Sequence, residues 1–215
     1  MTSESAFLSE LEVDALTELV NIGVSRAAAS LRQMVGRQVM LSVPSIEVTS
    51  RRTAAALMSE REVGPLVAIS QDFDGAFGGR ALLIFPEANS LALAKAVTGD
   101  ELDAEDLAEL EEEALKETGN VVLTNCLATM ANMLERPVQM SIPHVMRRDG
   151  TTLFQPDPAE AAGAVLFLYI NFAIQDHDIR GYLAVLMDVP SLDTLRVVIA
   201  DFITKVVGRR EATGA

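Results

Sequence analysis

Two sets of polar residues with the same spacing are the strongest candidates for chemistry in this chain. Each set contains an acid, a Glu, an Asn and a hydroxyl residue: Asp14, Glu18, Asn21 and Ser25 in the first, and Glu113, Glu117, Asn120 and Thr124 in the second. At about 100° per residue, an α-helix brings the four members of a set within an arc of roughly 60°. A carboxylate on that arc can pair with a cation, and the uncharged amide can donate and accept hydrogen bonds.

A shift of 99 residues superimposes the two sets and the sequence that follows them, without a gap. Identical residues in this register include Glu18 and Glu117, Asn21 and Asn120, Ala29 and Ala128, Arg37 and Arg136, Val39 and Val138, Ser42 and Ser141, and Pro44 and Pro143. We interpret the chain as an internal duplication. A single Glu-x-x-Asn is usually an ordinary solvated helix face. Asn is a poor helix former, however, and most surface positions differ between the copies, so folding alone explains the shared Asn poorly.

Both copies predict the same local structure. The capping box of Ser9 and Glu12 predicts a helix that begins near Ser9, and Gly36 suits its end. The second motif helix is expected to begin within residues 103–106, where acidic side chains favour a helix N-terminus. Extended segments are predicted over 38–50, 66–73, 80–85, 138–147, 164–174 and 180–187, and closing helices over 86–98 and 190–207.

This order predicts an α/β fold with pseudo-two-fold symmetry, in which a β-sheet packs with the long helices that carry the motifs. We expect one domain over 1–215, made of two homologous halves of about 9–99 and 103–208. The longest loop is expected at 148–163, where Pro156 and Pro158 interrupt regular structure.

Composition excludes several classes of function. The 215 residues suffice for one well-packed domain, and 31 acidic against 17 basic residues give a net charge of −14. Such a charge repels phosphate backbones and anionic lipid, so we expect neither nucleic acid nor membrane as a partner. The longest apolar run, residues 162–170, is too short to span a bilayer, and the N-terminus lacks a signal-peptide pattern. The single cysteine, Cys126, fits a reducing compartment, so a cytoplasmic location is expected.

The motif spacing resembles that of the CheC, CheX and FliY chemotaxis phosphatases. That signature has an Asp or Ser, then Glu and Asn at the spacing seen here, and a Pro after 22 further residues, which Pro44 and Pro143 satisfy. Two copies without an additional C-terminal domain resemble CheC in particular. Glu113 departs from the usual Asp or Ser, and Val20 departs from a common Gly before the Asn.

The resemblance implies a phosphatase that hydrolyses the aspartyl phosphate of a CheY-like response regulator. It implies that Asn21 and Asn120 position the attacking water and that Glu18 and Glu117 pair with a lysine of the receiver domain. Asp14 and Glu113 become peripheral partner contacts. The receiver domain would supply the Mg²⁺, so no cofactor or metal of the chain's own is expected. Whether a CheD-like deamidase also binds is left open.

A non-catalytic module of the same fold, binding a receiver or acting in a flagellar switch, is the main alternative. The paired Glu and Asn residues favour the enzyme, because binding alone does not require the amide. Other signals have simpler explanations. We expect Cys126 in the core, Asp176-His177-Asp178 in a solvated turn, and the acidic run 101–117 on a solvated helix face. Pro44 and Pro143 are interpreted as structural.

Overall fold

The computed structural model describes residues 8–43, 46–98, 104–155, 163–174 and 177–213. The first half contains α1 (Glu10–Val35), β1 (Val39–Ser42), β2 (Ile46–Ser50), α2 (Arg51–Arg61), β3 (Leu66–Gly75), β4 (Gly79–Pro86), the 3-10 helix η1 (Glu87–Asn89) and α3 (Ser90–Thr98). The second half contains α4 (Ala104–Met133), β5 (Val138–Met140), β6 (His144–Arg148), α5 (Gly150–Leu153), β7 (Gly163–Ile174), β8 (His177–Asp188) and α6 (Val189–Thr213). Apart from η1, the two halves repeat one order of elements.

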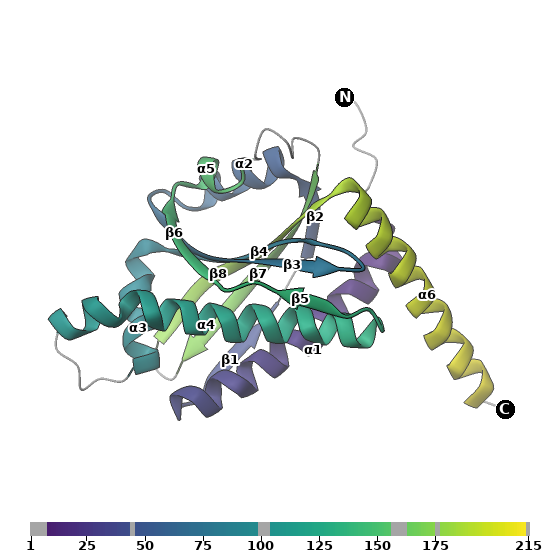
Figure 1. The fold of residues 1–215 in the computed structure, drawn as a ribbon, viewed down its shortest axis with the longest axis horizontal. Helices are drawn as coiled ribbons and strands as arrows, with labels where there is room; N and C mark the ends of the chain where they lie inside the picture. Colours follow the sequence, from purple (N-terminus) through teal and green to yellow (C-terminus); the bar gives the residue numbers. More distant parts are fainter. Residues whose placement is uncertain (1–7, 44–45, 99–103, 156–162, 175–176, 214–215) are drawn as a thin grey trace.

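One curled antiparallel sheet combines the strands of both halves (Figure 1). Its order is β1-β7-β8-β4-β3-β5, and β2 and β6 add to β7 and β3 respectively. The first two strands of each half therefore pair with the hairpin of the other half. The pairings are equivalent: β1 aligns Ser42 with Asn171, and the Ser141 amide that follows β5 donates to the Asp72 carbonyl at 2.8 Å. A shift of 99 residues carries one pair onto the other.

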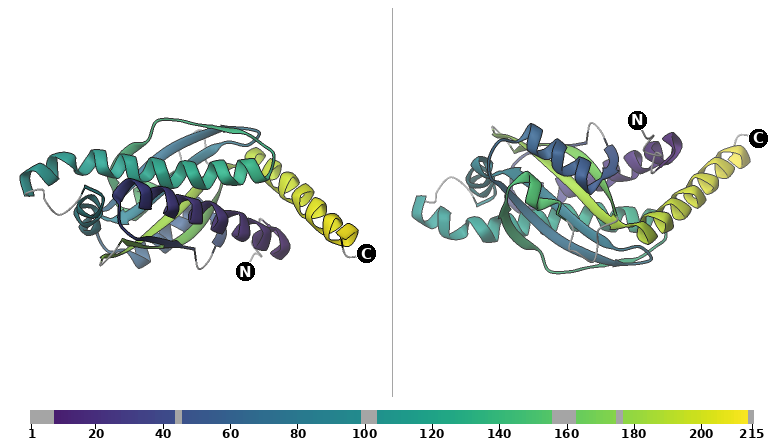
Figure 2. Two further views of the ribbon diagram at one scale, coloured as in Figure 1. Left: turned by 90° about the horizontal axis from the view of Figure 1, so that it is seen from below. Right: turned by 90° about the horizontal axis from the view of Figure 1, so that it is seen from above.

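The sheet separates two hydrophobic cores. Residues alternate between the faces along each strand, as the pleat requires: Val67 and Ile69 enter the core with α1, α3, α4 and α6, while Leu66 and Ala68 enter a smaller core with α2 and α5. Figure 2 shows α1 and α4 together on one face and α2 and α5 on the other. The long motif helices thus have one buried side against the sheet and one outer side.

Helices α1 and α4 run side by side in opposite directions (Figure 2). Gly23 lets the helices approach closely, since an added Cβ there would lie 2.9 Å from the Cα of Cys126. Bonds of 3.5 Å from Arg26 to Thr129 and from Ser30 to Asn125 join the helices further along. The pairing fixes the two motifs relative to one another.

The predicted fold class and the main elements are confirmed. Ser9 and Glu12 form the expected capping box, and Gly36 ends α1 with a left-handed φ of 65°. The predicted order of elements in each half, a helix, three extended segments and a closing helix, was incomplete. The first extended segment of each half, 38–50 or 138–147, contains two strands, and a helix that was not predicted follows them. These helices begin at side-chain caps, in which Ser50 accepts from the Thr53 amide and Asp149 accepts from Thr151 and Thr152. The expected loop at 148–163 therefore contains α5.

No helix among the described residues is both long enough and apolar enough to cross a membrane.

Candidate functional site

The first motif lies on the outer side of α1. Asp14 and Glu18 are exposed and Asn21 is half-buried, while Leu16, Leu19 and Val20, on the opposite side of the helix, are buried. Ser25 is also exposed, and its hydroxyl donates to the Asn21 backbone carbonyl at 2.8 Å. That hydroxyl is thus turned back onto the helix. The Asp14, Glu18 and Asn21 side chains remain as the polar groups that α1 presents.

The second motif occupies the matching side of α4. Glu113 and Glu117 are exposed, and Asn120 and Thr124 are half-buried. Leu115, Val122 and Leu123 are buried in the main core. The structure therefore brings the predicted residues of each copy together on one helix face, as the spacing indicated, although their chemical roles stay a prediction.

The four motif acids differ from their acidic neighbours in making no ion pair with any described residue. Glu112 pairs with Lys116 at 2.6 Å, and Glu111 with Arg147 at 3.2 Å. Within the described part of the chain, none of the motif acids makes an ion pair or a side-chain hydrogen bond; they are Asp14, Glu18, Glu113 and Glu117. These carboxylates are available to a cation from a partner.

Asn120 is held by a residue that the sequence analysis missed. Gln71 on β3 is 2% exposed, and its Nε2 lies 2.8 Å from the Ser141 carbonyl oxygen, 3.4 Å from Asn120 Oδ1 and 3.5 Å from Thr124 Oγ1. Thr124 also donates to Asn120 Oδ1 at 3.3 Å. The sequence does mark Gln71 as unusual, because it is a polar residue at a core-facing position of a strand whose other core-facing positions, Val67, Ile69 and Phe73, are apolar. The sequence alone does not indicate that Gln71 contacts Asn120.

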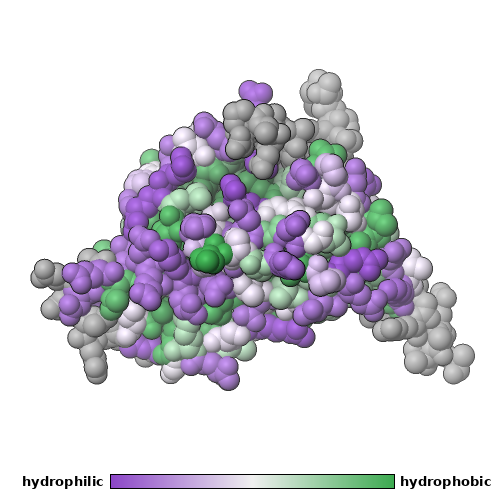
Figure 3. Space-filling model, viewed as in Figure 1, coloured by the Kyte–Doolittle hydropathy of each residue, from purple (hydrophilic) through white to green (hydrophobic). Residues whose placement is uncertain are grey.

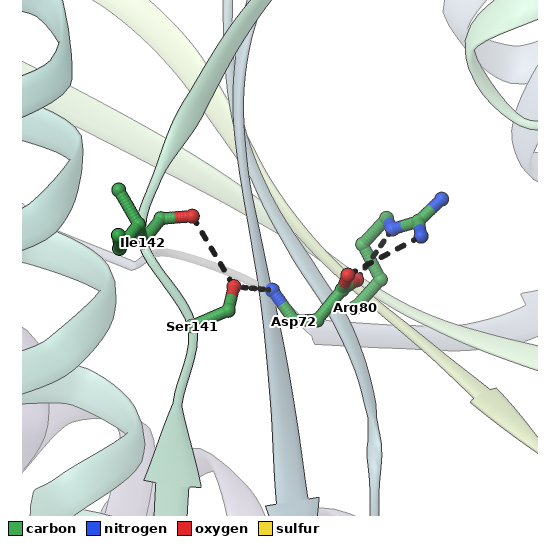
Figure 4. A network of polar contacts seen from close by, with 4 residues as sticks. All are labelled: Asp72, Arg80, Ser141 and Ile142. Carbon is green, nitrogen blue, oxygen red and sulfur yellow. Dashed lines mark hydrogen bonds and ion pairs between the residues drawn. The ribbon is translucent and has the colours of Figure 1, made fainter.

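The segment of residues 141–143, which follows β5, lies opposite α4 at the second site. The Ser141 hydroxyl accepts from the Asp72 amide at 2.9 Å and donates to the Ile142 carbonyl at 3.2 Å, while Asp72 pairs with Arg80 at 2.6 Å (Figure 4). This network ties the segment to β3. The Ile142 side chain is left 77% exposed beside the motif.

A depression of about 700 Å³ lies between α4 and this segment. It is lined by Val97, Thr98, Leu110, Glu113, Ala114, Lys116, Glu117, Asn120, Ile142 and Pro143. Hydrophobic residues are interspersed with hydrophilic ones over the face that Figure 3 shows. The second motif therefore stands beside a recess that offers both polar and apolar contacts.

Gly119 sets how closely α4 approaches the sheet. An added Cβ at this position would lie 2.3 Å from Cγ2 of Ile69 on β3. This close approach puts Asn120, the next residue, within reach of Gln71. The first copy has Val20 at the matching position, with its side chain 2% exposed, and the position matching Gln71 is the buried Ile170.

The two sites consequently differ. In the described residues around α1, the Asn21 carboxamide makes no hydrogen bond, whereas the Asn120 Oδ1 accepts two. Pro44, which belongs to the first motif, lies outside the described residues, while Pro143 is half-buried.

The other sequence candidates do not form sites in the described structure. Cys126 is buried, which confirms its predicted place in the core, and burial raises the pKa of its thiol to about 12. Asp176 lies outside the described residues, and the predicted turn is wrong for His177 and Asp178, which begin strand β8. Over the described chain, no three His, Cys, Asp or Glu residues are grouped to hold a metal ion.

Comparisons with known proteins agree with the resemblance of the motifs. No family model matches the chain. It is 27% identical over 146 residues to the flagellar motor switch phosphatase FliY of Bacillus subtilis, a match that covers 67% of this chain and 38% of that protein. It is 26% identical over 141 residues to the CheY-P phosphatase CheC of the same organism, covering 64% of this chain and 67% of that protein. The chain thus spans well under half of the FliY that it matches.

Solved structures share the fold. The crystal structure of Thermotoga maritima FliY has a TM-score of 0.70 at 17% identity, covering 91% of this chain and 98% of that one. FliM of Helicobacter pylori, in its complex with SpeE, has a TM-score of 0.65 at 11% identity, covering 90% and 97%. Sequence similarity, motif spacing and fold thus agree in making the chain similar to the CheC and FliY phosphatases.

Proposed function

We propose that the chain is a phosphatase that hydrolyses the aspartyl phosphate of a CheY-like response regulator. One observation carries the proposal: each motif helix presents an Asn beside carboxylates that make no ion pair among the described residues. The names of the relatives support it, since B. subtilis CheC is a CheY-P phosphatase and FliY a flagellar motor switch phosphatase.

The chemistry needs little from the chain beyond positioning. An acyl phosphate is already activated, and the receiver domain brings the Mg²⁺ and a lysine that neutralise charge on the phosphoryl group. Asn21 and Asn120 enter the partner's site and hold the attacking water in line with phosphorus. A carboxamide suits this role because it makes hydrogen bonds without repelling the anionic phosphate. Such positioning is worth up to about 7–11 kcal/mol in favourable cases.

The acids provide docking. Glu18 and Glu117 lie one helical turn before the Asn residues and pair with the receiver's lysine, which orients the partner relative to the amide. Asp14 and Glu113 lie a further turn away and make peripheral contacts. The acidic surface of a chain with net charge −14 accelerates association with a basic patch around that lysine.

The test is phosphate release from a panel of phosphorylated receiver domains in the presence of Mg²⁺. The expected result is that at least one receiver loses phosphate faster than it does alone, and in proportion to the amount of chain added. The matched control is Asn132→Ala, which removes an exposed Asn from the same helix as Asn120. Release at the receiver's own rate for every receiver would refute the proposal.

A flagellar-switch-like binding module is the second candidate, favoured by the fold shared with FliM. This candidate predicts that the chain binds a receiver without accelerating loss of phosphate. Binding measured with a non-hydrolysable phosphoryl mimic, beside the release assay, separates the two candidates.

A further inference from the structure

We propose that Gln71 is a positioning residue that fixes the Asn120 carboxamide so that its Nδ2 group, a hydrogen-bond donor, faces the partner. The inference rests on the proposed function and specifies how the second motif performs it. It also makes the two motifs chemically unequal.

The orientation of Gln71 follows from its partner on the segment after β5. Its amide group lies 2.8 Å from the carbonyl oxygen of Ser141, which can only accept. The Gln71 atom at that position must therefore be Nε2. Its second N–H is directed toward α4, where Asn120 Oδ1 lies at 3.4 Å and Thr124 Oγ1 at 3.5 Å.

The orientation of Asn120 follows in turn. The atom that faces the Gln71 donor must be the acceptor, Oδ1, and the Thr124 hydroxyl donates to the same oxygen at 3.3 Å. Two donors occupy both lone pairs of this oxygen. The Nδ2 group points away from them and donates no hydrogen bond within the described structure. It is the atom of Asn120 left for a water molecule or a phosphoryl oxygen.

Folding alone does not account for Gln71. Its Oε1 is buried and has no hydrogen-bond partner among the described residues. An unsatisfied buried acceptor lowers stability, and an apolar side chain of similar size would avoid that cost. The first copy has Ile170 at the matching position, which shows that the fold accepts an apolar residue there.

Gly119 provides the geometry that the contact needs. The absence of a side chain there lets α4 approach Ile69 closely, and Asn120 follows directly. Val20 fills the matching position of α1. The first motif therefore lacks both the polar support and the glycine. Asn21 is free to present either end of its amide, whereas Asn120 presents the donor.

The experiment uses Gln71→Met, which keeps the length of the side chain and removes the donor. In an Asn21→Ala background, where only the second motif remains, we expect kcat to fall by about 10- to 100-fold. The KM for the phosphorylated receiver stays unchanged, because Glu117 is intact and Ser141 keeps its two bonds to Asp72. Gln139→Met, an exposed glutamine on β5, is the matched control.

Coupling to Asn120 distinguishes positioning from general damage. When Asn120 is already Ala, Gln71→Met causes no further loss of rate. Equal losses in both backgrounds, or no loss in the Asn21→Ala background, would overturn the inference. An Asn21→Ala protein without activity would overturn it too, while leaving the proposed function to the first motif.

A readout that is independent of activity separates this inference from the proposed function. The side-chain ¹⁵N–¹H₂ signal of Asn120 reports how rigidly its amide is held. We expect a high order parameter for Asn120 and a low one for Asn21, with Asn120 becoming mobile in Gln71→Met. Equal mobility of the two amides in the unsubstituted chain contradicts the inference, whatever the receivers show.

Discussion

Gly119 of α4 packs directly against Ile69 of β3, so closely that no side chain fits between the helix and the strand. The contact lies at the centre of the second site, because it sets the distance between the motif helix and the sheet. The matching helix of the first half has Val20 and needs no such contact.

Gly119→Ala is expected to destabilise the fold by about 1–3 kcal/mol, because the new methyl would overlap Ile69 and force the helix outward. The free energy of unfolding in denaturant measures the loss. Asn132→Ala on the exposed side of the same helix should change it by less than about 0.5 kcal/mol. A Gly119→Ala protein as stable as this control would contradict the close packing.

The motif acids are expected to act on binding. Glu18→Gln combined with Glu117→Gln should raise KM for a phosphorylated receiver by about tenfold or more, because each change removes one partner of a charge-assisted pair. Kinetics at several salt concentrations also test this, since the unsubstituted chain should lose affinity more steeply as salt rises. Glu10→Gln combined with Glu109→Gln is the matched control, because it also removes one negative charge from an exposed position on each motif helix. A similar rise in KM for this control would show that only net charge matters.

Stability should depend on pH through the cap of α1. The backbone amide of Ser9 donates to the Glu12 carboxylate at 2.7 Å, and this bond holds the pKa of Glu12 below its usual value despite opposing desolvation. A depressed pKa in the folded state means that the contribution to stability is present above the unfolded pKa and is lost as pH falls through the folded pKa. The free energy of unfolding should therefore decrease between about pH 5 and pH 3, and less steeply in Glu12→Gln. Glu10→Gln in the same turn is the control, and identical slopes for all three proteins would contradict the role of the cap.

Cys126 should be inert in the folded protein. Its burial raises the pKa of the thiol to about 12, so almost no thiolate forms near neutral pH. Mass spectrometry after treatment with a maleimide should find no adduct in the native chain and one adduct in denaturant. Rapid labelling of the native chain would show that Cys126 is accessible and would contradict its position in the core.

Local signals in the sequence predicted the long helices well. The capping box at Ser9, the glycine at position 36 and the apolar stripe together specify α1, and the same period specifies α4. The outer position of the motif residues followed from that period alone. Helix α2 was missed because it buries little, with only Ala54 and Met58 fully covered, and its start depends on a single cap at Ser50.

The pairing between the halves could not be predicted from local sequence. Strands β1 and β2 join the hairpin of the second half, and β5 and β6 join that of the first, so contacts form between residues far apart in the chain. Gln71 in the first half and Asn120 in the second are 49 positions apart and meet only in the folded chain. The two sites differ at this contact, because Ile170 takes the place of Gln71 under the other motif.

Removing both amides together tests the central claim most directly. Single-turnover release of phosphate from a cognate phosphorylated receiver should slow in Asn21→Ala and again in Asn120→Ala, and should return to the receiver's own rate in the double variant. Circular dichroism and binding to the receiver should stay unchanged, because neither side chain belongs to the hydrophobic core and the acids remain. A folded double variant that still releases phosphate at the unsubstituted rate would contradict a role for the two amides in hydrolysis.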